Sequence, residues 1–292
     1  MMIDNLEFYI VDVFAEEKYS GNQLAVVRGG GDLSKEYMQM IAKEMGYSET
    51  TFILSDEEQD GGYPVRIFTP EEEVPFAGHP TLGTAYIIQR EIIRKDVDAV
   101  VLNLDVGQIP VMFREGYLEM KQMAPTFGEI VPDEKVAKAL NVDLSSLDDN
   151  YPSQVVSTGI PFLMVPMKSL SDVINCPVRA GGYQEFLDGP GGKGILVFTR
   201  DSVNSENDLH VRVFAGGYGV AEDPATGSAN GCLAGYLVKH SYLGDDKIDI
   251  RVEQGFEIGR PSILFLNASS DGDSIQVNVG GQVFMVARGN LV

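Results

Sequence analysis

The chain has 292 residues, enough for two domains of ordinary size, and its composition of 44% hydrophobic and 22% charged residues is typical of globular proteins. Its formal net charge of −21 at pH 7 repels phosphate backbones and anionic membrane surfaces. We therefore expect neither a nucleic acid nor a membrane as a partner.

The cysteines and the N-terminal sequence indicate the compartment. The two cysteines, Cys176 and Cys232, are too few for a disulfide framework in a chain of this length. The first apolar run has no basic region before it and is interrupted by Asp12, so we predict neither a signal peptide nor a membrane anchor. We expect a cytoplasmic protein.

Predicted strands follow one another along most of the chain, from residues 8–14 to residues 282–287. Helical patterns are fewer, and in chain order they cover residues 34–46, 79–90, 133–140 and 224–240. Strand–turn–strand spacing outweighs strand–helix–strand alternation, which favours an α+β fold with antiparallel or mixed sheets.

One stretch of sequence occurs in each half of the chain. The copies, residues 66–86 and 212–231, both begin with Arg, a β-branched residue and Phe, as a strand would. Each then reaches an acid or imidazole followed by proline, and small residues come next. In this register the small residues pair as Gly83 with Gly227 and Thr84 with Ser228. Two long copies predict two similar domains rather than a solenoid of short units.

The X-Pro steps of the repeat, His79-Pro80 and Asp223-Pro224, predict where two helices begin. Proline suits the first helical turn, where its missing N–H has no partner, so the residue before it is expected at or near the N-cap. The free N–H groups and the helix dipole at such an end attract a carboxylate. We expect the two ends to face one interdomain cleft and hold a small acid, although Asp-Pro is also ordinary capping chemistry.

A further carboxylate of interest is Glu49, which follows a predicted helix and precedes the strand-like residues 50–53. A glutamate that faces inward at such an edge is suited to act as a general base. The alternative is an exposed turn residue, as most glutamates are.

The remaining histidines and cysteines have no metal-site spacing, so we expect no metal. His240 ends the predicted 224–240 helix, where a cation complements the helix dipole. His210 is expected to be a surface or packed residue of a strand, and Cys232 a small core residue of the helix.

These motifs together resemble the PhzF-like family, named for the phenazine-biosynthesis isomerase, which shares the two-domain fold of diaminopimelate epimerase. The resemblance covers nearly the whole chain, and its most specific stretches are "GHPTLG" and "EDPATGSA". It implies two pseudo-symmetric domains, each a curved mixed β-sheet or barrel around a central helix. The first would comprise residues 1–122, joined by 282–292, and the second residues 123–281.

The resemblance also implies roles for seven residues. Glu49 matches the glutamate that moves a proton between carbons, and His79 and Asp223 match residues that line the same cavity. The residues expected to bind the substrate are Asn22, Gly78, Gly227 and Ser228. The family usually reads Gly-Asn-Pro where this chain has Gly-Asn-Gln at residues 21–23. The implied protein is a homodimer that acts on a small carboxylic acid with no cofactor.

Three functions are compatible with this reading. The first is an isomerase in which Glu49 removes a proton from one carbon and returns it at another, assisted by His79 or Asp223. The second is a two-thiol epimerase or racemase, which is disfavoured because neither cysteine occupies the His79 or Asp223 position. The third is a protein that binds a small acid without turnover, since fold does not fix function.

Overall fold

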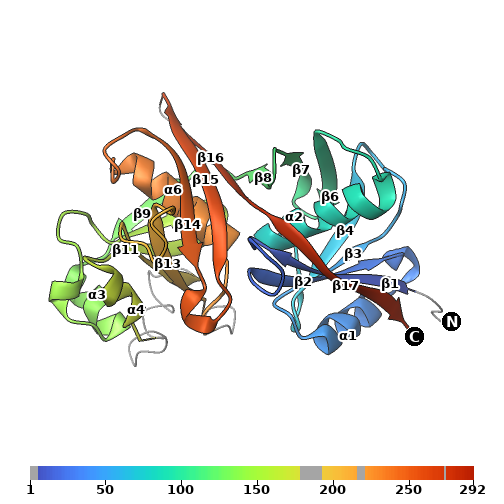
Figure 1. The fold of residues 1–292 in the computed structure, drawn as a ribbon, viewed down its shortest axis with the longest axis horizontal. Coiled ribbons are helices and arrows are strands. Elements are labelled where there is room, and N and C mark those ends of the chain that lie inside the picture. The colour runs from blue at the N-terminus through green and yellow to red at the C-terminus, as the bar shows by residue number, and fades with distance from the viewer. Residues whose placement is uncertain (1–5, 178–192, 216–220, 273) are drawn as a thin grey trace. The chain divides into compact units, whose positions relative to one another are not determined.

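The protein is described by a computed structural model that covers residues 6–177, 193–215, 221–272 and 274–292 (Figure 1). The chain divides into two compact units. Unit 1 comprises Met1–Met120 and Gly280–Val292, and unit 2 comprises Lys121–Val279. Both ends of the chain therefore belong to unit 1, and the whole of unit 2 is inserted between two parts of its sequence.

Unit 1 is built on a mixed sheet. Its first strand, β1, pairs antiparallel with both the second strand of the chain and the last one, β17. The following pairs include the parallel pairs β2–β3 and β4–β6 and the antiparallel pairs β3–β4 and β6–β7. The elements are β1 Leu6–Val13, β2 Asn22–Arg28, η1 Gly30–Asp32, α1 Lys35–Met45, β3 Thr50–Ile53, β4 Tyr63–Phe68, β5 Glu73–Val74, α2 Gly78–Ile87, a π-helical turn η2 Ile88–Ile93, β6 Ala99–Leu104, β7 Gly107–Phe113, β8 Leu118–Lys121 and β17 Val283–Leu291.

Unit 2 repeats this construction. Antiparallel pairs join β9 to β10, β10 to β11, β12 to β13 and β14 to β15, and parallel pairs join β11 to β12 and β13 to β14. The elements are β9 Thr126–Ile130, α3 Asp133–Leu140, η3 Leu144–Ser146, β10 Gln154–Ser157, β11 Pro161–Pro166, α4 Leu170–Ile174, β12 Gly194–Thr199, β13 Leu209–Phe214, α6 Gly227–Lys239, β14 Lys247–Gln254, η5 Phe256–Ile258, β15 Ser262–Asp271 and β16 Ser274–Gly281. The predicted α+β fold class is confirmed.

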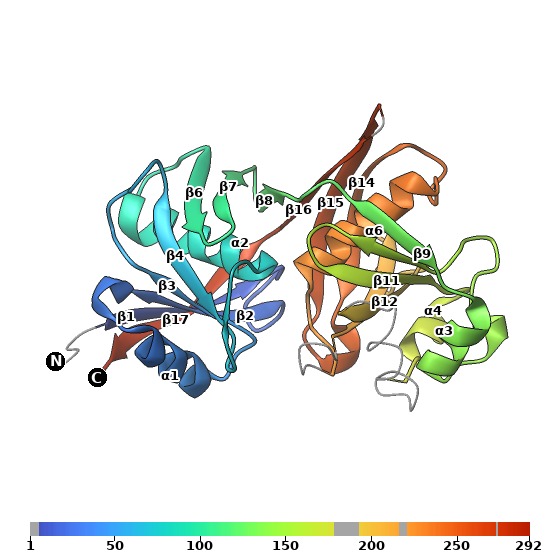
Figure 2. The same cartoon turned by 180° about the vertical axis from the view of Figure 1, so that it is seen from behind.

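Each unit encloses one helix among its strands, α2 in unit 1 and α6 in unit 2 (Figures 1 and 2). Most residues of both helices are buried on every side, unlike the amphipathic helix α1. Close packing explains the glycine in the middle of α2, because a Cβ at Gly83 would lie 2.6 Å from the Leu24 side chain and 2.9 Å from that of Val13. In unit 1, the central helix thus packs closely against β1 and β2.

The helix predictions are confirmed in place but not in every boundary. Residues 133–140 form α3 as predicted, whereas the helix expected from residue 224 begins only at Gly227. The helix starts therefore pair Gly78 with Gly227 and His79 with Ser228, so the register that paired Gly83 with Gly227 is wrong by five residues.

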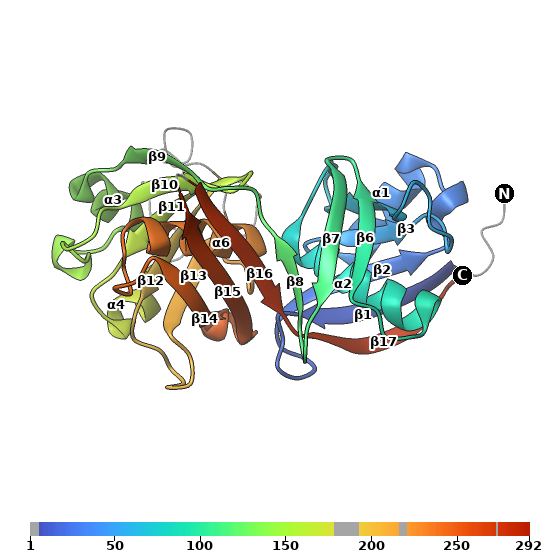
Figure 3. The ribbon, with the colours of Figure 1, turned by 90° about the horizontal axis from the view of Figure 1, so that it is seen from above.

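The chain crosses between the units at residues 120–121 and 279–280, and the strands β1 and β17 lie side by side in unit 1 (Figure 3). Among the described helices, none combines the length and the apolar character that a membrane crossing requires.

Candidate functional site

The N-termini of the two central helices differ from those of α1 and α4, whereas the outer helix α3, which begins after Pro132, has no side-chain cap from a described residue either. Ser34 caps α1 and Ser169 caps α4 through their side chains. Within the described residues, no side chain caps the N-terminus of α2, at Ala77, or that of α6, at Thr226. The first backbone N–H groups of α2 and α6 can therefore donate hydrogen bonds to an external anion.

His79 occupies the first turn of α2, where its imidazole is almost completely buried. Burial lowers its pKa to about 3, against the opposing effect of a hydrogen bond to the Gln23 backbone. The ring is thus neutral at physiological pH. Its Nε2 atom lies 3.4 Å from Oε2 of Glu49. A neutral imidazole that donates through one nitrogen presents a lone pair on the other.

Glu49 stands in the segment between α1 and β3, directly before the first residue of that strand. Its side chain is 19% exposed, so the carboxylate faces inward toward His79 but is still reachable by a ligand. The strand behind it is anchored to α2, because the hydroxyls of Thr51 and Thr84 lie 2.7 Å apart. The sheet and the central helix together hold Glu49 beside His79.

The other predicted residues of unit 1 lie close by in the chain. Asn22 is the first residue of β2 and is buried, next to the residue whose backbone bonds His79. Gly78 is the first residue of α2 and precedes His79. The structure thus brings Glu49 and His79 into contact and places Asn22 and Gly78 at neighbouring chain positions.

In unit 2, Asp223 lies in the turn that connects β13 to α6. Its backbone N–H donates to the Val213 carbonyl, and its Oδ2 atom accepts a short 2.5 Å hydrogen bond from the Thr226 hydroxyl. These bonds hold Asp223 in the turn, three residues before the N-cap. The predicted position of Pro224 in the first helical turn is therefore wrong.

Gly227 and Ser228 open the helix that follows. Gly227 is buried and Ser228 is half-buried. The Ser228 carbonyl accepts a long hydrogen bond of 3.5 Å from the Thr158 hydroxyl. By the position of the helix starts, Ser228 is the counterpart of His79.

A similar arginine–glutamate pair precedes each central helix. In unit 1, Arg66 binds both carboxylate oxygens of Glu73, at 2.6 and 2.8 Å. In unit 2, Arg212 binds both oxygens of Glu222, at 2.9 and 2.8 Å. Each guanidinium also lies over the phenylalanine two residues later, at 5.2 and 5.0 Å. These matched contacts support the internal repeat, because paired planar hydrogen bonds fix an arginine in one orientation.

Unit 2 also contains a buried cluster of charged side chains. His210 contacts Glu253 through Nδ1 at 2.9 Å and Glu257 through Nε2 at 2.8 Å. Burial opposes its charge, but the hydrogen bonds to both glutamates outweigh burial and raise the pKa of His210 to about 9. Both ring nitrogens are occupied, so His210 is a structural cation, which fits the packed alternative.

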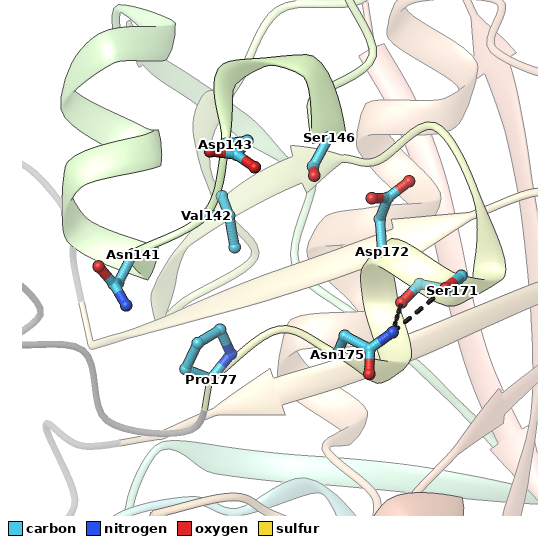
Figure 4. A pocket seen from close by; sticks show the side chains of 8 residues that line it. All are labelled: Asn141, Val142, Asp143, Ser146, Ser171, Asp172, Asn175 and Pro177. Atoms are coloured by element: carbon cyan, nitrogen blue, oxygen red, sulfur yellow. Dashed lines mark hydrogen bonds between the residues drawn. The ribbon is translucent and has the colours of Figure 1, made fainter.

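Two cavities, one in each unit, are lined by other residues than the predicted ones. One of about 310 Å³ in unit 2 is lined by side chains of the segments around α3 and α4 (Figure 4). Its described lining residues include the acids Asp143 and Asp172 and no basic side chain, a lining that does not suit an anionic ligand. Another, of about 590 Å³, lies in unit 1 and includes Arg114 and Phe284.

The two cysteine thiols do not lie at the predicted site residues either. Cys176 and Cys232 are both buried, and burial raises their pKa to about 12 and about 11. Cys232 is the sixth residue of α6, away from the helix start. Neither is a thiolate at physiological pH, so the structure gives no support to a two-thiol mechanism.

The sequence analysis did not predict three groups that contact His79 or Asp223. They are the backbone of Gln23 and the side chains of Thr226 and Gln254. Thr226 could have been predicted, because a hydroxyl residue three positions after Asp223 in a turn is suited to hydrogen-bond it. Gln254 could not be recognised from the sequence, because its side-chain contacts join residues 24 to 31 positions apart.

The fold resembles that of a hydroxyproline epimerase and that of a PhzF-family protein. A hydroxyproline epimerase from Agrobacterium vitis, 9% identical, superposes with a TM-score of 0.63 over 99% of this chain and 91% of its own, a likeness of fold alone. The Bacillus anthracis phenazine biosynthesis protein of the PhzF family, 24% identical, superposes with a TM-score of 0.88 over 99% of this chain and 100% of its own.

The sequence defines the family. The model of the phenazine biosynthesis-like proteins, PhzC-PhzF, matches residues 11–289. The chain therefore belongs to the phenazine biosynthesis-like family. A trans-2,3-dihydro-3-hydroxyanthranilate isomerase from Pseudomonas aeruginosa is 33% identical over 97% of this chain and 99% of its own length. The predicted resemblance is confirmed, as is the prediction of an isomerase of this family.

Proposed function

We propose that the protein moves a proton between two carbons of a small carboxylic acid, with Glu49 as the general acid and base. The observation that supports this most is the contact of the Glu49 carboxylate with the neutral ring of His79, 3.4 Å away. An inward carboxylate beside an uncharged acceptor suits a group that must both take up and release a proton. The substrate class follows from the uncapped helix starts, which favour a carboxylate.

Each step uses groups of this chain. Glu49 removes a proton from the carbon, and the bonding electrons of that C–H bond move into the substrate's conjugated system. Backbone N–H groups at the helix starts stabilise the negative charge that develops. The protonated Glu49 is held beside Nε2 of His79 until the proton is delivered to the second carbon. Asp223 assists that return. The interdomain cleft expected from the sequence stays a prediction.

The substrate of the relatives gives the first probe. Because a relative of similar length is named as a trans-2,3-dihydro-3-hydroxyanthranilate isomerase, we propose that this compound, or a small acid with a comparable conjugated ring, is turned over. A panel of small carboxylic acids that starts with this compound should be incubated with the protein in heavy water. Incorporation of deuterium at carbon, followed by mass spectrometry, reports the proton transfer.

Glu49→Gln tests the general base. We expect deuterium incorporation to fall by a factor of about 10² to 10⁴, the usual contribution of a general base, while the acid still binds. Glu44→Gln is the matched control, since it makes the same change at an exposed position of α1. Full activity of Glu49→Gln would contradict the assignment. Binding without any exchange in the unaltered protein would instead favour the binding-only alternative.

A further inference from the structure

We propose that Gln254 is a positioning residue, whose side-chain amide directs the Thr226 hydroxyl onto the carboxylate of Asp223. Gln254 ends β14 and is fully buried. This inference rests on the function proposed above, because it matters for the reaction only if Asp223 assists the return of the proton.

The Gln254 amide uses all of its hydrogen-bonding capacity on one short segment. Its Nε2 atom donates to the Asp223 carbonyl at 2.8 Å and to the Thr226 hydroxyl at 3.1 Å. Its Oε1 atom accepts from the Thr226 backbone N–H at 3.2 Å and from the Asn230 side chain at 2.8 Å. A primary amide has two donor hydrogens and two acceptor lone pairs, so every position is occupied.

These contacts fix the direction of the next hydrogen bond. The Thr226 hydroxyl accepts from Gln254, so its own proton is free to point to Oδ2 of Asp223, 2.5 Å away. An ionised carboxylate has no proton to give, which makes the hydroxyl the donor. The Asp223 carboxylate therefore takes its orientation from Gln254 through Thr226.

The strand beneath the turn supplies a rigid base for this amide. Gln254 pairs with Val211 of β13 and with Ser262 of β15. The next residue, Gly255, has φ of 79°, and a Cβ there would lie 2.5 Å from the Pro224 carbonyl oxygen. Only glycine suits such a position, so the turn rests directly on the backbone after Gln254.

Two substitutions test the proposal by kinetics. Gln254→Glu keeps the shape and the acceptor atom but removes the donors, and Gln254→Leu removes both. With trans-2,3-dihydro-3-hydroxyanthranilate as the probe, we expect kcat to fall at least about tenfold while KM changes less than about twofold. The control is Gln154→Leu, another buried glutamine of unit 2, whose amide bonds Gly128 and His240 instead. It should lose comparable thermal stability and keep its kcat.

A double-mutant cycle separates positioning from a general loss of structure. If Gln254 acts through Asp223, adding Gln254→Leu to Asp223→Asn should lower kcat by less than about twofold more. Independent, multiplicative losses would overturn the proposal, as would an unchanged kcat in Gln254→Glu.

A measurement without substrate keeps this test apart from that of the proposed function. In amide hydrogen exchange, Gln254→Leu should speed exchange of the Thr226 amide at least about tenfold, and Gln154→Leu should not. Unchanged protection of Thr226 would overturn the proposal even if the protein turns over the probe. Faster exchange would support the positioning contact even if Glu49 proves not to be the base.

Discussion

The three histidines show how strongly the surroundings of a side chain determine its pKa. Burial alone lowers the pKa of His79 to about 3, whereas two glutamates outweigh the burial of His210 and raise its pKa to about 9. Burial and the neighbouring Lys239 lower the pKa of His240, which caps the end of α6. The sequence suggested a cation at His240, but this depressed pKa means that the ring is neutral at physiological pH.

The charge of His210 makes stability depend on pH. Its folded pKa of about 9 lies above the ordinary value of 6.5, so its stabilisation is fully present below pH 6.5 and is lost as the pH rises through about 9. The stabilisation at stake is on the order of 3 kcal/mol. We expect the difference in Tm between the unaltered protein and His210→Gln to shrink steadily from pH 6.5 to pH 9.5.

The control is His240→Gln. Since its folded pKa is lowered, any pH dependence from His240 lies below pH 6.5. The Tm difference for this variant should stay flat over the same range. A His210→Gln difference that is equally flat would show that His210 is not a cation in the folded protein.

How far single residues could be predicted depends on the distance over which they act. The Glu49 position was found because a carboxylate at the edge between a helix and a strand is visible in a few residues of sequence. His79 was found from its X-Pro step. Gln254 was invisible, since its hydrogen bonds to the Asp223 turn follow no periodicity and depend on the pairing of β14 with its neighbours.

At the scale of elements, α1 and α4 have a side-chain cap at the N-terminus, whereas the two central helices and the outer helix α3 have none among the described residues. Ser34 accepts a hydrogen bond from the Tyr37 amide and closes the start of α1. The starts of α2 and α6 have no such side-chain cap in the described structure. An uncapped helix end costs stability, so leaving it open in the two most buried helices is consistent with a ligand that fills the place of the cap.

The substitution Ala77→Ser tests this reading by adding a cap to α2. The third helical residue, Pro80, has no N–H, so the new serine hydroxyl would accept a hydrogen bond from the backbone N–H of His79. We expect the protein to become more stable by about 1 kcal/mol and KM for an acid substrate to rise several-fold. Thermal unfolding and steady-state kinetics measure the two effects.

The opposite change at an outer helix is the control. Ser34→Ala should lower stability by about 1 kcal/mol and leave KM unchanged. A rise in the stability of Ala77→Ser with no change in KM would mean that the substrate does not use the open N–H groups of α2.

The boundaries of the helices could be predicted where local sequence sets them. α3 begins after Pro132 with acidic residues in its first turn and ends at Asn141 in the left-handed conformation, all of which are local signals. α6 was expected three residues too early, because Asp223-Pro224 has the sequence of a helix start. Hydrogen bonds of the Asp223 backbone with Val213 and Gln254 hold this turn in a non-helical conformation, so the helix begins only at Gly227.

The charge of the whole molecule acts on any anionic substrate. The net charge of −21 repels an acid at long range, whereas each helix start adds only about half a positive charge and acts locally. The Debye length falls from about 30 Å at 0.01 M salt to about 10 Å at 0.1 M. Salt therefore screens the long-range repulsion much more than the attraction at the site.

Salt should accordingly raise activity at low ionic strength. We expect kcat/KM for a carboxylate substrate to increase several-fold between about 10 mM and 200 mM sodium chloride. The control substrate is the uncharged amide of the same acid, for which kcat/KM should stay constant wherever turnover is measurable. A decrease with salt would mean that local attraction dominates the encounter.

The insertion of unit 2 within unit 1 sets the order in which the protein is completed during synthesis. β1 leaves the ribosome before unit 2, but its partner β17 leaves only after it. All strands of unit 2 are therefore synthesised before unit 1 is complete. The edge of β1 that pairs with β17 therefore stays unpaired while the whole of unit 2 is synthesised, and an unpaired strand edge is a site for premature association with other chains.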